Sequence, residues 1–223
     1  MLHRLVGDLM TSAVVSVRQD TGFKDIAERL AHHDITAVPV VDGQDRPVGV
    51  VSEADLLRKQ ESQADPGGHL AAAHPSPAER TKAHALTAEE LMTGPAVVAR
   101  PQWSVVEAAR AMARHHVKRL PVVDDAGRLV GIVSRADLLR VFLRRDLTIG
   151  EEITTDILTR TLGLTPGTVV VQVTDGRVTL SGTVPQESLI PIAVRLSESV
   201  DGVVDVTNLL RPETGTAVDT PRR

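Results

Sequence analysis

The chain has 223 residues, of which 42% are hydrophobic and 24% are charged, a composition typical of a folded protein with room for more than one small domain. Its 25 basic and 29 acidic residues give a net charge of −4, without the cationic excess that sequence-independent binding to nucleic acid requires. The absence of cysteine excludes disulfides, thiolate catalysis and thiolate-ligated zinc. No run approaches the roughly 18 apolar residues of a membrane helix, and the opening MLHRLVGDLM does not resemble a signal peptide, so we expect a cytoplasmic protein.

A duplicated segment organises the first two thirds of the chain. A shift of 82 residues aligns residues 5–57 with residues 87–139 without a gap, and 21 of the 53 aligned positions are identical. Two copies indicate a duplicated module and not a solenoid. The identities form three blocks: Leu9–Thr11 with Leu91–Thr93, Pro39–Asp42 with Pro121–Asp124, and Gly49–Leu57 with Gly131–Leu139.

The periodicity of each copy predicts the order β-α-β-β-α. Apolar residues recur at helical spacing over residues 23–31 and again over residues 105–113, and Ser104 with Glu107 matches a capping box. Apolar runs at residues 37–41 and 48–51, separated by a polar turn, predict a buried hairpin that the second copy repeats.

A different pattern follows Arg145. A helical stripe (Ile149, Ile153, Ile157 and Leu158), two strands joined by Asp175–Gly176, a second helix and a last strand predict a small α-β-β-α-β domain. The fold class expected for the whole chain is α+β. The expected segments are a first repeat domain at 1–58, a flexible linker at 59–86, a second repeat domain at 87–146, a third domain at 149–212 and a disordered tail at 213–223.

The order of the repeated blocks resembles a known family. Leu-Met-Thr, then Pro-Val-Val-Asp, then Gly-x-Val-Ser-x-Ala-Asp, found twice at a fixed offset, resemble a tandem pair of cystathionine beta-synthase (CBS) domains. The resemblance covers about 110 residues. It implies a pseudo-twofold unit that often dimerises and that binds adenosine-containing ligands between the copies.

Candidate ligand-binding residues follow from the motifs. Each motif serine begins a helix after a buried strand, where backbone N–H groups and its hydroxyl would face a phosphate, and each aspartate three residues later can accept both ribose hydroxyls. By resemblance, backbone at Val38–Pro39 and Leu120–Pro121 and the two threonines would frame the adenine. Ser-x-x-Asp is equally a capping box, which explains these residues without a ligand, and both interpretations stay open. The candidates are Thr11, Val38, Ser52, Asp55, Thr93, Arg119, Leu120, Pro121, Ser134, Arg135 and Asp137.

The two copies differ in charge near these motifs. Where the first copy has Thr36, Ala37 and Glu53, the second has Lys118, Arg119 and Arg135. Because each charge-assisted hydrogen bond contributes about 1.5–3 kcal/mol, we expect phosphate to prefer the second copy. Substitution of Arg119 or Asp137 should then weaken adenine-nucleotide binding more than substitution of Ala37 or Asp55. The alternative for the basic residues is a solvated surface.

The third domain resembles the BON domain, named for bacterial osmotically inducible and nodulation proteins. The strands at 169–184 with their Asp-Gly turn and the ending Gly202 to Leu209 support the resemblance. Such domains are often suggested to bind phospholipid or to mediate attachment to other proteins. Residues 151–212 contain eight acidic and four basic side chains, a net charge of −4, which disfavours an anionic membrane and favours a protein partner.

We therefore expect a bacterial regulatory protein, a homodimer that senses an adenosine ligand of the AMP, ADP or ATP type and relays its bound state to a partner through the BON domain. No catalytic residues are expected, because no nucleophile with an adjacent base, no paired catalytic carboxylates and no Gly-rich phosphate loop occur in the sequence. No metal-binding residues are expected either. Two alternatives remain: a ligand-independent dimeric scaffold, and a peripheral membrane-associated envelope protein.

Overall fold

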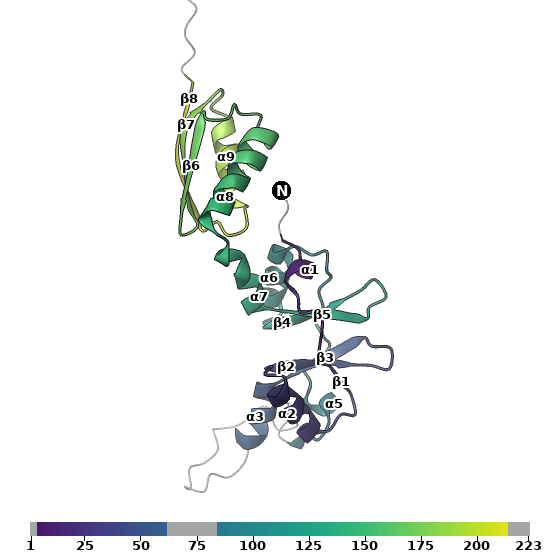
Figure 1. The fold of residues 1–223 in the computed structure, drawn as a ribbon. Coiled ribbons are helices and arrows are strands. Elements are labelled where there is room, and N and C mark those ends of the chain that lie inside the picture. The colour runs from purple at the N-terminus through teal and green to yellow at the C-terminus, as the bar shows by residue number, and fades with distance from the viewer. Residues whose placement is uncertain (1–3, 62–83, 214–223) are drawn as a thin grey trace, which may run out of the picture. The chain divides into compact units, whose positions relative to one another are not determined.

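The computed structural model describes residues 4–61 and 84–213, drawn in Figure 1. The chain separates into two compact units: one contains residues 5–138, and the other contains residues 139–213 together with Arg4. Most of the expected linker and nearly all of the expected tail lie outside the described residues. At the two ends of the expected linker the chain is structured: a helix continues to Glu61, and Ala85 is only 2% exposed.

The first repeat is a three-stranded sheet covered by helices. β1 (Val17–Arg18) pairs in parallel with β2 (Ala37–Val41). β2 pairs antiparallel with β3 (Pro47–Ser52), which confirms the predicted hairpin. The expected helical face is confirmed, because Ile26 and Leu30 are buried against Val38, Val40 and Val51. Its elements are α1 (Val6–Leu9), β1 (Val17–Arg18), α2 (Phe23–His32), β2 (Ala37–Val41), β3 (Pro47–Ser52) and α3 (Glu53–Glu61).

The second repeat follows the same order with one strand fewer. Ala99 forms only an isolated parallel bridge with Val122 where the first repeat has β1. The predicted capping box is confirmed: Ser104 N donates to Glu107 Oε2 at 2.7 Å, and Glu107 N donates to Ser104 Oγ at 3.2 Å. The elements are α5 (Ala88–Leu91), α6 (Val105–Arg114), β4 (Arg119–Val123), β5 (Leu129–Ser134) and α7 (Arg135–Leu139).

The N-terminal segment of each repeat pairs with the sheet of the other. Thr11 N donates to Ile132 O at 2.9 Å and Ile132 N donates to Thr11 O at 3.0 Å. The positions 82 residues away form the reciprocal pair, with Thr93 N to Val50 O at 2.9 Å and Val50 N to Thr93 O at 3.1 Å. Each sheet is therefore extended by an isolated bridge to the N-terminal segment of the other repeat, and these reciprocal contacts follow a pseudo-twofold axis that exchanges the two repeats.

Two methionines explain the glycine of the repeated motif. A Cβ added to Gly49 would lie 2.8 Å from Met92 Cγ, and one added to Gly131 would lie 3.0 Å from Met10 Cγ. The short helices obey the same exchange, because Val6 N donates to the carbonyl of Trp103 while Ala88 N donates to that of Thr21, at 2.8 and 2.9 Å. Identical residues (Met10 and Met92, Gly49 and Gly131) and the backbone of equivalent residues thus hold the two repeats together.

The C-terminal unit is a three-stranded sheet with helices on one face (Figure 1). β6 and β7 are antiparallel and β7 and β8 are parallel, which confirms the predicted order, and all four residues of the predicted stripe are buried. The elements are the 3-10 helix η1 (Arg140–Leu143), α8 (Asp146–Glu152), the π-helix η2 (Ile153–Thr161), β6 (Val169–Thr174), β7 (Arg177–Val184), α9 (Leu189–Glu198) and β8 (Asp205–Pro212).

The predicted two-residue turn of this unit is anchored from outside the hairpin. Asp175 and Gly176 both have positive φ, at 51° and 72°, as a type I′ turn demands. Asp146 accepts both of their N–H groups, at 2.8 and 2.9 Å, and so ties the start of α8 to the hairpin.

The first helix of the unit differs from the simple α-helix that its periodicity predicts. From Ile153 it is a π-helix, in which the hydroxyl of Thr159 donates to Thr154 O at 2.9 Å and that of Thr161 donates to Asp156 O at 2.6 Å. Both bonds reach back five residues, so the threonine hydroxyls fit the wider turn.

Candidate functional site

The serine and aspartate of each motif bond to each other. Ser52 N and Oγ donate to Asp55 Oδ2 at 2.9 and 2.7 Å, and Ser134 N and Oγ donate to Asp137 Oδ2 at the same distances. The capping interpretation is therefore present in the geometry. Because the two oxygens of a carboxylate offer about four acceptor positions, these bonds do not exclude a ligand hydroxyl.

The N-terminal threonines lie with the opposite repeat. Thr11 pairs with Ile132, two residues before Ser134 on β5, whereas Thr93 pairs with Val50, two residues before Ser52 on β3. The structure therefore brings the candidates together in two groups, each drawn from both repeats. We name them the Asp137 site (Thr11, Arg119, Leu120, Pro121, Ser134 and Asp137) and the Asp55 site (Thr93, Val38, Ser52 and Asp55).

Arg119 crosses between the repeats at the Asp137 site. It is the first residue of β4, and its Nη2 donates to the hydroxyl of Thr36 in the first repeat. Partial burial lowers the pKa of the Arg119 guanidinium, whereas the carboxylates of Glu53 and Asp137 raise it. A cation from one repeat thus faces a carboxylate from each.

The strand residues of the two groups can act only through their main chain. Val38 and Leu120 are fully buried, and the prolines that follow them are buried too. Ala99 N already donates to Pro121 O at 2.9 Å, so that carbonyl has a partner. Arg135, the last candidate, has an exposed side chain, and its N–H donates to Lys118 O at 3.0 Å.

Thr36 was not among the candidates, although the structure places its hydroxyl at the Asp137 site. The alignment of the repeats makes it the equivalent of Lys118, next to the equivalent of Arg119. That equivalence is visible in the sequence, but the facing of the two strands across the axis is not. The sequence therefore identifies Thr36 as a site residue only when the exchange of segments between the repeats is known.

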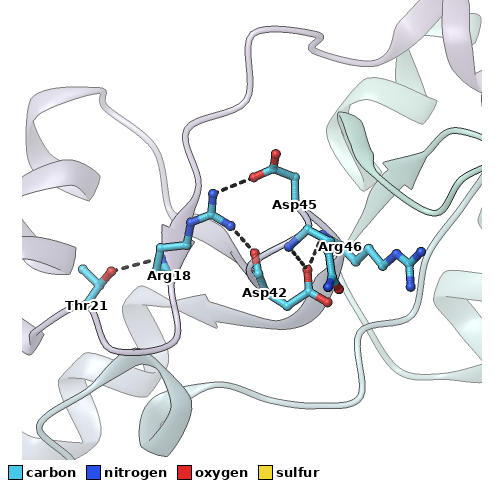
Figure 2. Close-up of polar contacts among 6 residues, drawn as sticks. Arg18, Thr21, Asp42, Asp45 and Arg46 are labelled. Carbon is cyan, nitrogen blue, oxygen red and sulfur yellow. Dashed lines mark hydrogen bonds and ion pairs between the residues drawn. The ribbon is translucent and has the colours of Figure 1, made fainter.

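A separate polar cluster surrounds the hairpin turns. Asp42 Oδ1 accepts the N–H groups of Gln44 and Arg46 at 2.8 and 2.9 Å, and Figure 2 shows Arg18 reaching the same turn, where it bonds to Asp42 O and to Asp45 Oδ1. Backbone donation, first from Arg46 and then from Gln44, lowers the pKa of the Asp42 carboxyl. The second repeat has the equivalent turn around Asp124.

Two hollows lie elsewhere in this unit. A cavity of about 370 Å³ lies between the hairpin turns of the two repeats. An open depression of about 790 Å³ is lined by residues of α2 and by His33. Neither is lined by any candidate residue. The cavity is lined by Ser12, Val14, Ser16, Val41, Asp45, Asp124, Arg128, Leu129 and Val130.

Two absences concern residues 4–61 and 84–213 only. No three His, Cys, Asp or Glu side chains in these ranges are grouped to bind a metal ion. No helix in the same ranges is both long enough and apolar enough to span a bilayer.

Comparison with known sequences places two domain types in the chain. The profile of the CBS domain matches residues 6–62 and 88–144, and that of the BON domain matches residues 146–212. An uncharacterised protein of Methanopyrus kandleri is 31% identical over 147 residues, which cover 66% of this chain and 67% of that protein. Homoserine O-acetyltransferase of Methanococcoides burtonii is 30% identical over 141 residues, but these are 63% of this chain and only 25% of the enzyme.

Two solved structures resemble the repeats and contain adenosine compounds. CBSX2 from Arabidopsis thaliana, in complex with AMP, has a TM-score of 0.53 and 31% identity over 62% of this chain and 96% of that chain. Another CBS domain pair, in complex with 5′-methylthioadenosine and S-adenosyl-L-methionine, has a TM-score of 0.51 and 26% identity, over 63% of this chain and 97% of that one.

Proposed function

Because the chain belongs to the CBS domain family, as a tandem pair followed by a BON domain, we propose that it is a regulatory protein that binds an adenosine-containing ligand between its repeats. The strongest support is that two solved CBS pairs, 31% and 26% identical to this chain, are complexes with such compounds. The regulatory signal would be a shift between conformations, which requires that the ligand bind one conformation more tightly than the other.

The exchange of segments gives this proposal a physical basis. A ligand at the Asp137 site would lie among Thr11 and Thr36 of the first repeat and Arg119 and Asp137 of the second. Binding at such a place changes the free energy of contacts between repeats, because both repeats supply groups to it.

Each candidate has a role in this proposal. The carboxylates of Asp55 and Asp137 accept hydrogen bonds from the ribose hydroxyls, and main-chain groups along β2 and β4 contact the adenine. The remaining candidates divide into hydroxyls and cations that face phosphate (Ser52, Ser134, Arg119 and Arg135) and residues that frame the base (Thr11, Thr93, Val38, Leu120 and Pro121).

We also propose that the BON domain relays the bound state to a protein partner. The net charge of −4 over residues 151–212 supports a protein over an anionic lipid surface. A direct check is co-sedimentation of the full chain with vesicles of anionic lipid. Binding to those vesicles would favour the peripheral membrane alternative instead.

CBS domain pairs commonly dimerise, and we extend this property to the present chain. Leu57 and Leu139, equivalent residues in the last helix of each repeat, are 57% and 61% exposed, which is unusual for leucine and fits a surface that a second copy covers. Light scattering should give twice the chain mass of 23.9 kDa. A single-chain mass at high micromolar concentration would contradict the dimer.

We further propose that the protein is not an enzyme. The enzyme names among its relatives are compatible with this proposal. The matched segment is only a quarter of the length of the homoserine O-acetyltransferase. The expected cytoplasmic location stays a prediction.

A thermal-shift panel tests the ligand. Adenosine, AMP, ADP, ATP, NAD and S-adenosylmethionine are added to the full chain, with GMP as the control for the base. A ligand present at about 100 times its Kd adds roughly 2.7 kcal/mol of stability, which raises Tm by several degrees in a protein of this size.

A matched pair of variants separates site binding from unspecific stabilisation. The double variant Asp55→Asn and Asp137→Asn should lose the shift, whereas Asp20→Ala, at an exposed carboxylate, should keep it. No shift with any adenosine compound would contradict the proposal and favour the ligand-independent scaffold.

A further inference from the structure

One observed contact between the repeats implies a second, equivalent contact when the pseudo-twofold axis is applied to it. Arg119 is equivalent to Ala37, and Thr36 is equivalent to Lys118. The hydrogen bond from Arg119 to Thr36 crosses the axis. The same operation that exchanges the reciprocal bridges would therefore bring Lys118 towards Ala37, which starts β2 and pairs with Ser52 of the Asp55 site.

The backbone anchors of the two junctions support this transfer. Glu53 N donates to Thr36 O at 3.1 Å, and Arg135 N donates to Lys118 O at 3.0 Å. Glu53 and Arg135 are thus held at equivalent positions, each by the residue that precedes the strand. Since the Glu53 carboxylate acts on the charge of Arg119 in the Asp137 site, the axis places Arg135 at the corresponding position near Ala37.

The charges of the two sites then differ in the opposite way from the expectation based on sequence alone. At the Asp137 site the cation Arg119 faces the carboxylates of Glu53 and Asp137. At the Asp55 site the same operation would bring two cations of the second repeat, Lys118 and Arg135, towards the carboxylate of Asp55. A phosphate would be attracted more strongly to the Asp55 site, because the charge of Arg119 at the Asp137 site is already balanced by two carboxylates.

We propose that the Asp55 site is the main phosphate-binding site for an adenosine phosphate, with Lys118 and Arg135 supplied by the opposite repeat, and that Glu53 weakens phosphate binding at the Asp137 site. This inference rests on the proposed function and concerns which of its two sites prefers a phosphate. Lys118 and Arg135 contact the phosphate, and the adenosine part depends on the other residues of each site.

Calorimetric titration of the full chain with AMP, and with adenosine as the ligand lacking phosphate, tests the assignment. Lys118→Ala and Arg135→Ala should each raise the Kd for AMP at the tighter site roughly tenfold, and should leave the Kd for adenosine unchanged. Arg114→Ala, at an exposed arginine of α6, is the matched control and should alter neither. Glu53→Gln should tighten AMP binding at the weaker site several-fold.

Double variants identify the site that each cation serves. Lys118→Ala should add nothing to Asp55→Asn, because that site is already lost, and should keep its full effect on top of Asp137→Asn. The opposite pattern would show that the cations serve the site of their own repeat and would overturn the inference while leaving the proposed function intact. A wild-type chain that binds neither AMP nor adenosine would instead overturn the proposed function itself.

Discussion

The two CBS repeats have the same backbone order and differ in charge where they meet. The residues that hold them together are identical or equivalent: Met10 and Met92 pack on Gly131 and Gly49, and Thr11 pairs across the axis as Thr93 does. The residues that differ most in charge, Thr36 and Lys118 among them, lie beside the candidate sites. The comparison shows that symmetric packing can be combined with two sites of unequal charge.

One backbone hydrogen bond is found in only one of its two equivalent positions, because the other position is occupied by a proline. Leu129 N donates to Asp45 O at 2.9 Å and joins the two hairpin turns. The residue equivalent to Leu129 is Pro47, which has no N–H group to donate. The reciprocal hydrogen bond cannot form.

The largest expected effect concerns whether the two exchanged segments contribute equally to stability. Leu9 and Leu91 are equivalent residues of the exchanged segments, 6% and 0% exposed. Leu9→Ala and Leu91→Ala should each lower the free energy of unfolding by about 2–5 kcal/mol, because each leaves a cavity in a core. Urea denaturation measures both, and a large loss in only one variant would show that the exchange is not reciprocal.

A second test addresses the glycine and methionine contacts. Gly49→Ala should cost about 1–3 kcal/mol, because the new methyl group overlaps Met92, and Met92→Ala in the same chain should recover part of the loss. Gly131→Ala with Met10→Ala should behave alike. Gly43→Ala is the control, since nothing lies within 4 Å of its added Cβ. Failure of the methionine variants to recover stability would place the strain elsewhere.

A third prediction exposes the asymmetry. Thr36→Val removes the acceptor of the partly buried Arg119 and should destabilise the protein by about 1 kcal/mol. Lys118→Met, at the equivalent exposed position, should change stability by less than about 0.5 kcal/mol. Equal losses in chemical denaturation would show that the contact between the repeats adds nothing specific.

The smallest effect concerns the hairpin turns and their pH dependence. The pKa values of Asp42 and Asp124 are below their ordinary 3.8, mainly because backbone N–H groups donate to the charged carboxylates. Such groups stabilise the folded state above that pH, and the contribution is lost as the pH falls through the lowered values. Asp42→Asn and Asp124→Asn should each lower Tm at pH 7 by roughly 1–2 °C.

Melting curves from pH 7 to pH 2.5 check the sign. The difference between wild type and each variant should shrink on acidification, as the aspartates become protonated. A difference that grows on acidification would contradict the role of the charged carboxylates.

Local signals predicted most of the elements. The stripe from Ile149 to Leu158 and the Asp175–Gly176 turn correctly indicated the helix and hairpin of the BON domain, and Ser104 with Glu107 correctly marked the start of α6. These features depend on residues a few positions apart. The π-helical continuation from Ile153 did not follow from the same signals, because the buried stripe is compatible with either winding.

The site was only partly predictable. The motifs pointed to Ser134 and Asp137, and the structure shows them bonded to each other. The contribution of Thr36 and the crossing of Arg119 were not foreseen, because both depend on which surfaces of the repeats face each other.

The amino-acid sequence by itself determined the duplication, the order of strands and helices apart from the first strand of the second repeat, and the separate C-terminal domain, since periodicity, turn residues and caps act locally. Only the tertiary structure decided that each N-terminal segment bridges to the sheet of the other repeat and that the side chains of Arg119 and Thr36, from different repeats, meet at the Asp137 site. Hydrogen bonds such as Thr11 to Ile132 join residues far apart in the chain, and their partners are selected by packing around the axis.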